Sequence, residues 1–256
     1  MSSLEPLLRL WRALDDHLER VEPTPWGAVV TDARFPQIHD ANYARVEPGH
    51  PGLTAAEVEV ALRPALARVG RNQLHVVLFD PEVNTDMLAA WSAAGHRLSW
   101  DAAMVHRGPA PKDGGVEVEE LADLEEAFWA RARESLPFFG EGTPEELDAV
   151  ARLEREVMTP NTGKRWFVVR DAERIVSMTS LTVLEGVGYL DHVATFPEAR
   201  GRGYAGALVG RAIVESQAVA ADDVWLLTEP DGPALPLYER LGFAEAGRIA
   251  SFLGTF

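Results

Sequence analysis

The sequence contains no cysteine. Disulfide bonds, thiolate metal sites and a cysteine nucleophile are therefore excluded. Histidine occurs at seven positions, but no two of them have the spacing of metal-binding pairs such as H-E-x-x-H or H-x-x-x-H. We therefore expect no metal.

Positive charge is also scarce. Lysine and arginine total 24 against 40 aspartates and glutamates, which gives a formal net charge of −16. A field of this sign repels nucleic acid and anionic membranes and favours cationic partners. The phosphate loop G-x-x-x-x-G-K-[ST], the nucleophile elbow G-x-S-x-G and strips of basic and aromatic residues are missing as well. We therefore expect neither nucleic acid nor a membrane as a partner.

A long hydrophobic run is absent from the start of the chain. Apolar residues of segment 1–23 recur at helical spacing, with charges interspersed: Leu4, Leu7, Leu8, Trp11, Leu14 and Leu18. This pattern is typical of an amphipathic surface helix and not of a signal peptide or a membrane span. We therefore expect a cytoplasmic protein.

Apolar residues are nevertheless plentiful. They make up 46% of the 256 residues, enough to fill the cores of two domains of ordinary size. Segment 106–120 combines two prolines and three glycines with few apolar residues, which is typical of a linker. The sequence therefore predicts one domain at 1–110 and a second at 115–256.

The second half has a regular alternation of elements. A strand at 115–121 precedes helices at 122–135 and 143–158, the latter opened by a capping box of Thr143 and Glu146. Further elements follow in the order strand, strand, strand, helix, strand, helix, strand: 165–171, 174–184, 188–196, 204–220, 224–229, 233–242 and 244–254. The pattern predicts a mixed α/β sheet.

The first half resembles a degenerate copy of the same plan. A hairpin at 25–49 precedes a helix at 54–69, and 74–108 reads as strand, helix and strand. Aligning Gly95 with Gly242 places Trp91 where Tyr238 stands. The loop at 47–52, "EPGHPG", lacks an arginine and a tight glycine series. An unrelated α/β cap domain is the alternative.

The loop "PEARGRGYAGAL", at 197–208, can be interpreted in three ways. Gly201, Gly203 and Gly206 match the dinucleotide fingerprint G-x-G-x-x-G. However, four residues separate the strand from Gly201, and only 27 residues follow Glu229, too few for a doubly wound sheet. A purely structural turn is the second interpretation. In the third, successive backbone N–H groups and the following helix dipole form a pyrophosphate cradle, to which nearby arginines add charge.

Two motifs together favour the third interpretation. Segment 193–209 resembles the R/Q-x-x-G-x-G/A motif of the GNAT superfamily of acyl-CoA-dependent N-acyltransferases, and 233–243 resembles its A-x-x-L-Y-x-x-x-G-F motif. The matching residues are Arg200, Gly203, Ala205, Ala234, Leu237, Tyr238, Gly242 and Phe243. The resemblance covers about 115–256. It implies a GNAT fold, a mixed splayed sheet flanked by helices, here as two GNAT-like domains in tandem with a degenerate first copy.

The resemblance also implies acetyl-CoA as co-substrate and a set of residues that hold it. The strand at 188–196 should splay from the strand at 224–229, so that pantetheine pairs with its backbone and an N–H stabilises the oxyanion. Asp231 stands where the family often has asparagine, and capping of the next helix is the alternative. The expected cofactor-binding residues are Val193, Ala194, Thr195, Arg200, Gly201, Arg202, Gly203, Tyr204, Ala205, Gly206 and Asp231.

Two catalytic residues are implied in the same way. Tyr238 is the candidate general acid that protonates the CoA thiolate, and an ordinary core tyrosine is the alternative. Asp191 is the candidate general base. His192 is adjacent, but regular strand alternation would send it to the opposite face. Glu229, at the end of its strand, is a further candidate base.

The function expected is an N-acetyltransferase that acts on a primary amine of a small molecule or peptide. A non-catalytic acyl-CoA sensor is the alternative, and a nicotinamide oxidoreductase is disfavoured by the loop spacing. The loop at 135–146 should wall the acceptor side. It offers apolar surface and negative charge: Phe138, Phe139, Glu141, Glu145 and Glu146.

Overall fold

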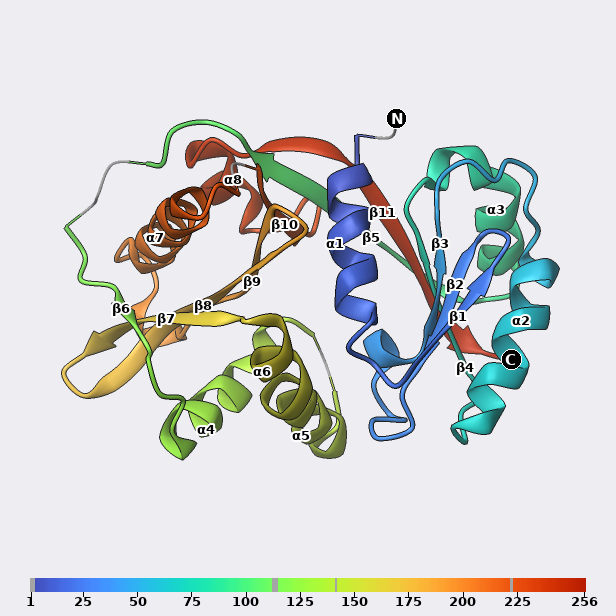
Figure 1. The fold of residues 1–256 in the computed structure, drawn as a ribbon, viewed down its shortest axis with the longest axis horizontal. Coiled ribbons are helices and arrows are strands. Elements are labelled where there is room, and N and C mark those ends of the chain that lie inside the picture. The colour runs from blue at the N-terminus through green and yellow to red at the C-terminus, as the bar shows by residue number, and fades with distance from the viewer. Residues whose placement is uncertain (1–2, 112–114, 141, 222) are drawn as a thin grey trace. The chain divides into compact units, whose positions relative to one another are not determined.

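A computed structural model describes residues 3–111, 115–140, 142–221 and 223–256. The chain forms two compact units that are discontinuous in sequence (Figure 1). The first unit comprises Met1–Ala103, Thr228–Asp231 and Glu245–Phe256, and the second comprises Met104–Leu227 and Gly232–Ala244. The division into two related segments, 1–110 and 115–256, stays a prediction about the origin of the halves.

The first unit is a mixed sheet with strand order β1-β2-β3-β4-β11-β5. Strand β4 runs parallel to β3 and antiparallel to β11, and the β1–β2 and β2–β3 pairs are antiparallel. Its elements are α1 (Glu5–Asp15), β1 (Arg20–Thr24), β2 (Gly27–Thr31), η1 (His39–Ala41), β3 (Tyr43–Val46), α2 (Ala55–Arg68), β4 (Gln73–Leu78), η2 (Pro81–Asn84), α3 (Thr85–Ala93), β5 (Arg97–His106) and β11 (Ala244–Thr255).

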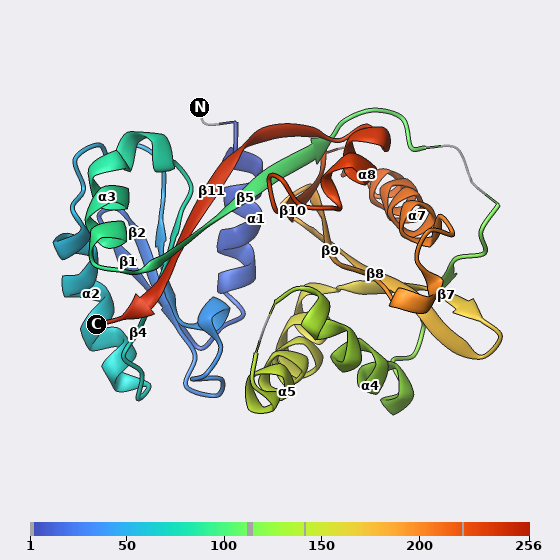
Figure 2. The ribbon, with the colours of Figure 1, turned by 180° about the vertical axis from the view of Figure 1, so that it is seen from behind.

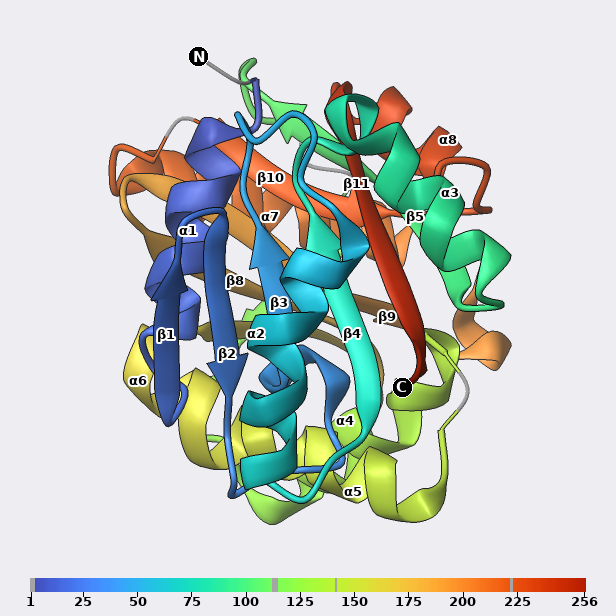
Figure 3. The ribbon, with the colours of Figure 1, turned by 90° about the vertical axis from the view of Figure 1, so that its right-hand side faces the viewer.

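Helix α2 covers strands β2 to β4 of this sheet (Figure 3). Its inner side packs into an apolar cluster with α3, β4 and β11 that includes Leu62, Trp91 and Phe252. The predicted N-terminal helix is confirmed as α1, which buries Leu7 and Leu8. The final strand, predicted at 244–254 within the second half, contributes to the first unit from Glu245 onward.

The second unit is a sheet with strand order β10-β9-β8-β7-β6, in which only β9 and β10 are parallel. Helix α7 covers one face, and α4 and α5 cover the other (Figures 1 and 2). Its elements are β6 (Glu119–Glu120), α4 (Glu126–Ser135), η3 (Leu136–Phe138), α5 (Pro144–Leu153), the π-helical η4 (Glu154–Met158), α6 (Thr159–Thr162), β7 (Arg165–Asp171), β8 (Arg174–Leu184), β9 (Val187–Thr195), η5 (Pro197–Ala199), α7 (Tyr204–Ala218), β10 (Asp223–Thr228) and α8 (Leu235–Arg240).

The helix predicted at 143–158 is only partly correct. The capping box of Thr143 and Glu146 forms as expected, and α5 follows it. At Leu153 the α-helix gives way to a π-helical turn that ends just before Pro160. A proline has no N–H for the bond to the carbonyl four residues earlier, and its ring crowds that carbonyl, so the chain adopts the wider turn there.

Candidate functional site

The glycine loop leaves an unusually open helix N-terminus in the second unit. Gly201 and Gly203 have φ values of 76° and 82°, in the left-handed region that glycine adopts without strain. Gly203 is the N-cap of the 15-residue helix α7, and no side chain caps it. From Gly201 to Gly206, no backbone N–H donates to any residue that the structure describes. Six free donors at the positive end of a helix dipole form a site for a multiply charged anion.

Two arginines flank this loop. Arg200 donates through Nε to the Thr195 carbonyl, 3.0 Å away, and its guanidinium lies 5.3 Å from the Phe138 ring. Its terminal amino groups bond to none of the described residues. Arg202 lies 3.4 Å from an Asp171 oxygen, and both of these side chains are exposed. Positive charge therefore borders the free N–H groups on both sides of Gly201.

Strand β9 separates from β10 after a short parallel contact. Their pairing runs from Asp223–Trp225 against Val187–Tyr189. The pairing with β10 thus ends six residues before β9 does, whereas the opposite edge stays paired with β8 as far as Thr195. The expected splay is confirmed. It leaves the β10-facing edge of residues 193–195 without a neighbouring strand, as an extended ligand would require, and the Thr195 carbonyl accepts from Arg200 Nε.

A β-bulge interrupts β9 next to this edge. The register with β8 changes between Met178↔Ala194 and Ser180↔Asp191, so that Thr179 faces two residues of β9. One of them, His192, has a φ of 54°, which is uncommon for a residue with a side chain. Bulges of this kind re-aim side chains and are over-represented next to active sites.

The bulge overturns the expected alternation of Asp191 and His192. Asp191 pairs with Ser180, which pairs with Trp166, so Asp191 shares the sheet face of Trp166. The His192 ring lies 5.2 Å from the Trp166 ring, and its Nε2 lies 2.7 Å from Ser135 Oγ on α4. The left-handed backbone at His192 therefore keeps both side chains on the α4 face, where regular alternation would have separated them.

The two neighbours differ in their electrostatics. Burial lowers the pKa of His192 to about 4, so the ring is neutral at neutral pH. Burial alone would raise the pKa of Asp191, but the Lys164 charge, the His192 ring and the His192 N–H outweigh it and hold the pKa below its ordinary value. Asp191 is therefore the ionised member of the pair, and its side chain is 49% exposed.

Tyr238 presents a free hydroxyl on α8. The residue is 6% exposed, and its ring packs edge-on against Phe243. Burial, and after it the charge of Asp191, raises the pKa of Tyr238 to about 12, so the phenol stays protonated. Its hydroxyl has no hydrogen-bonding partner among the described residues. The ring is core packing, as the alternative interpretation expected, but the hydroxyl is not used by the fold.

No motif in the sequence pointed to Lys164. This lysine follows Gly163, the left-handed residue that ends α6, and precedes β7. Its side chain is only 5% exposed, and its Nζ lies 2.9 Å from Glu154 and 3.5 Å from Asp191. A lysine just after a helix reads as a solvated end charge. Only the tertiary fold reveals that this one is buried between two carboxylates.

The acceptor-side loop is partly placed. Phe139 lies 4.9 Å from the His192 ring, and Phe138 lies 5.3 Å from the Phe196 ring, measured between ring centroids. Glu146 is engaged in the capping box, and Glu141 lies outside the described residues. Of the apolar half of the expected wall, Phe139 is therefore next to His192 and Phe138 is next to Phe196, and the role of both toward an acceptor stays a prediction.

Asp231 and Glu229 belong to the first unit, and their expected roles stay predictions. The alternative for Asp231, capping of the next helix, is wrong. Helix α8 begins at Leu235 with Ala234 as its N-cap, and no side chain bonds to that end. The predicted start of this helix at 233 is therefore two residues early.

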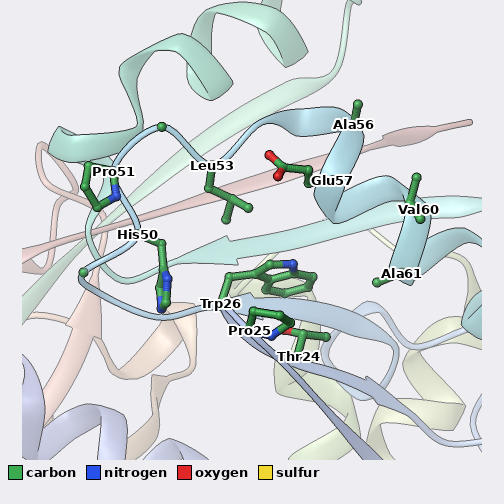
Figure 4. A pocket seen from close by; sticks show the side chains of 12 residues that line it. Thr24, Pro25, Trp26, His50, Pro51, Leu53, Ala56, Glu57, Val60 and Ala61 are labelled. Carbon is green, nitrogen blue, oxygen red and sulfur yellow. The ribbon is translucent and has the colours of Figure 1, made fainter.

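The corresponding loop of the first unit is built differently. A pocket of about 730 Å³ lies beside it, lined by Thr24, Pro25, Trp26, Gly49, His50, Pro51, Gly52, Leu53, Ala56, Glu57, Val60 and Ala61 (Figure 4). Helix α2 has a complete capping box: Thr54 Oγ1 accepts from the Glu57 N–H, and the Glu57 carboxylate accepts from the Thr54 N–H. A carboxylate of the chain itself thus occupies this helix N-terminus.

Comparison with known proteins supports the fold. Residues 121–243 match the acetyltransferase (GNAT) family. A search of curated proteins gave no match. A GCN5-related N-acetyltransferase from Kribbella flavida aligns with a TM-score of 0.69 at 18% identity, over 99% of this chain and 95% of that chain. A functionally unknown conserved protein from Staphylococcus epidermidis aligns with a TM-score of 0.68 at 11% identity, over 89% and 90%.

A tandem GNAT protein from the clavulanic acid biosynthesis pathway is also similar. Its TM-score is 0.55 at 14% identity, over 91% of this chain and 81% of that chain. These matches confirm the expected fold, a mixed splayed sheet flanked by helices in two tandem GNAT-like domains. Among the described helices, none is both long and apolar enough to cross a membrane.

Proposed function

The chain belongs to the GNAT family of acetyltransferases through residues 121–243, and on that premise we propose that it is an N-acetyltransferase. It transfers the acetyl group of acetyl-CoA to a primary amine of a small molecule or peptide, by direct attack in a ternary complex. We place this reaction in the cytoplasm and assign it to the second unit.

The observation that carries the proposal is the row of six free N–H groups at Gly201–Gly206. They fit the pyrophosphate of CoA, which presents several anionic oxygens to a helix N-terminus. Residue 203 has a left-handed φ of 82°, and a residue with a side chain would be strained in that conformation. Arg200 and Arg202, with Tyr204 and Ala205 in the first turn of α7, complete this part of the proposed site.

The open edge of β9 supports the placement of the thioester. Pantetheine carries two amides, and an extended chain with amides can pair with an open strand edge as an added strand. We assign this pairing to the backbone of Val193 and Thr195. An N–H at Val193 or Ala194 would then face the thioester carbonyl and stabilise the oxyanion that forms on it.

Asp191 and Tyr238 supply the proton transfers in this proposal. The amine nitrogen attacks the thioester carbon, and the tetrahedral intermediate expels the CoA sulfur. Asp191, ionised because its pKa lies below the ordinary value, takes the proton that the amine loses, through water. Tyr238, protonated because its pKa is about 12, gives a proton to the departing thiolate. Solvent then returns both groups to their starting states.

The acceptor is expected to arrive as a cation and to lose one proton to solvent, so that it attacks as the neutral amine. The chain has a net charge of −16, and the Asp191 carboxylate is half-exposed. Phe139 offers an apolar contact next to His192, and Phe138 offers another beside Phe196. A cationic amine with an apolar substituent combines these features.

Release of CoA thiol from acetyl-CoA with a panel of amines tests the proposal. We expect release that depends on the amine and saturates with it. A thermal shift with acetyl-CoA and CoA, but none with NAD, should accompany it. A shift with acetyl-CoA and no thiol release with any amine would leave a non-catalytic acyl-CoA sensor. Stabilisation by NAD alone would contradict the whole assignment.

A further inference from the structure

Lys164 provides a buried ammonium that the reaction above does not use. Its side chain is 5% exposed, and Nζ lies 6.0 Å from the centre of the Trp166 ring. Burying an ammonium is costly unless it is paired and hydrogen-bonded. Here two carboxylates pair with it: Glu154 at 2.9 Å and Asp191 at 3.5 Å. Burial alone would lower the pKa of Lys164, but these two charges raise it above its ordinary value.

Glu154 is the fixed end of this arrangement. It opens the π-helical turn before Pro160, and its side chain is 20% exposed. Its carboxylate also accepts a hydrogen bond from Thr159 Oγ1 at 2.9 Å, and that oxygen accepts from the Trp166 indole at 3.1 Å. Glu154 is therefore held by both the lysine and the threonine. Asp191, more loosely held and half-exposed, is the open end.

The summed charge of Lys164, Glu154 and Asp191 stays small at each stage of the proposed reaction. With Asp191 ionised, two carboxylates share one ammonium, and the sum is one negative charge. When Asp191 accepts the proton of the amine, the sum becomes zero, and Lys164 remains paired with Glu154. Without Glu154, the same step would leave a buried ammonium with no counter-charge, which is unfavourable.

We propose that Lys164 is a positioning residue of the transfer reaction, which orients the Asp191 carboxylate and keeps it ionised between turnovers, and that Glu154 limits how strongly it does so. This inference rests on the proposed function, because it assigns Lys164 a role through Asp191.

The groups that face Asp191 come from four elements. They are Lys164 before β7, His192 on β9, Tyr238 on α8 and, through the lysine, Glu154 on η4. At neutral pH His192 is neutral and Tyr238 is protonated, so only Lys164 and Glu154 add charge near the carboxylate. At the acidic pH where Asp191 titrates, the His192 ring is protonated as well and also favours the carboxylate. Removing the positive charge should raise the pKa of Asp191, and removing the negative charge should lower it.

The experiment compares Lys164→Met and Glu154→Gln in the full-length protein. We expect the acidic limb of the kcat–pH profile, at saturating acetyl-CoA and amine, to move up by about one pH unit or more in the first. In the second it should move down. Lys164→Arg keeps the charge and should restore the position of the limb. Arg152→Met is the control: it removes an exposed cation that pairs with Glu156, one helical turn further along the chain, and it should leave the kcat–pH profile unchanged.

A titration of ¹³C-labelled aspartate carboxyls by NMR gives the second readout. The Asp191 signal, identified by its loss in Asp191→Asn, should titrate at higher pH in Lys164→Met and at lower pH in Glu154→Gln. Shifts in the same direction, or no shift in either variant, would overturn the proposal. If thermal melting shows that Lys164→Met does not fold, the test rests on Glu154→Gln: titration of Asp191 at lower pH supports the proposal, and titration at the same or a higher pH overturns it.

This design separates two kinds of failure. If the parent protein is inactive but the Asp191 signal shifts in opposite directions in the two variants, the proposed function is contradicted. Lys164 then remains the group that lowers the pKa of the Asp191 carboxyl. An active parent whose variants share one pH profile retains the function and rejects the role of Lys164.

Discussion

The loops before α7 and α2 each lead from a strand of their own unit into a helix, but they treat the helix N-terminus in opposite ways. Before α7, no side chain caps the helix, and the N–H groups of Gly201–Gly206 bond to no described residue. Before α2, Thr54 and Glu57 complete a reciprocal capping box. One helix end is left for an anion, and the other already has a carboxylate in place.

The same contrast holds for the two aromatic residues that the alignment of Gly95 with Gly242 predicts to be equivalent. Trp91 is 1% exposed and donates its indole N–H to Glu59 at 3.0 Å. Tyr238 is nearly as buried, but its hydroxyl has no partner among the described residues. Trp91 thus uses its polar group within the fold, whereas Tyr238 leaves its hydroxyl available to a ligand.

Loss of the Tyr238 hydroxyl should have the largest effect. Tyr238→Phe keeps the ring against Phe243 and removes only the proposed acid, so we expect kcat to fall by about 100-fold, the low end for general acid catalysis. A thiolate is already a good leaving group, which is why the low end applies. The kcat/KM value should fall with it. Steady-state CoA release at several pH values provides the measurement.

Trp91→Phe is the matched control for that variant. It also removes one polar group from a buried ring, but one that the fold uses for Glu59. It should lower the melting temperature and leave kcat unchanged. A higher KM for acetyl-CoA with unchanged kcat in Tyr238→Phe would instead make Tyr238 a binding residue, and no change at all would make it core packing.

A side chain in the glycine loop should have the next largest effect. Gly203→Val must adopt a left-handed φ, at about 1–2 kcal/mol, and places methyl groups beside the proposed phosphate site. We expect CoA to bind at least about tenfold more weakly, which corresponds to 1.4 kcal/mol. Gly52→Val tests the other loop at a similar φ of 83°, also with nothing near the added Cβ.

The two glycine variants together isolate the phosphate contact from backbone strain. Both should lose a comparable amount of thermal stability, and only Gly203→Val should lose CoA affinity. Equal affinity in the parent and in a folded Gly203→Val would place the cradle elsewhere.

The smallest effect is expected from the cap of α2. Thr54→Ala removes the hydroxyl that accepts from the Glu57 N–H, which typically costs about 1 kcal/mol of stability. The melting temperature should fall by a few degrees, and CoA affinity should not change. A gain of CoA binding in this variant would mean that the capping box had been hiding a second site.

Much of this contrast was predictable from the sequence because it depends on local residues. The glycines of 201–206 act within one turn of the chain, so their spacing indicated the cradle. The capping box of Thr54 and Glu57 has the same local spacing as the predicted one at 143 and 146, but we identified it only in the structure. The splay of β9 was expected from the family resemblance and is confirmed by the short pairing with β10.

The remaining features depend on contacts between distant residues. The bulge at His192 arises from one extra residue in β9 relative to β8, and no motif marks it. The burial of Lys164 requires Glu154 and Asp191, which lie 10 residues before it and 27 residues after it. The π-helical turn could have been suspected from Pro160, but helical periodicity continued through it.

Calorimetric titration of the full-length protein with CoA tests the central claim most directly. The claim is that the free N–H groups before α7 form the single CoA site, whereas the capped helix α2 offers none. We expect a stoichiometry near one, with an affinity that falls at least about tenfold in Gly203→Val and is retained in Gly52→Val. A stoichiometry near two, or heat that is lost in Gly52→Val and retained in Gly203→Val, would contradict it.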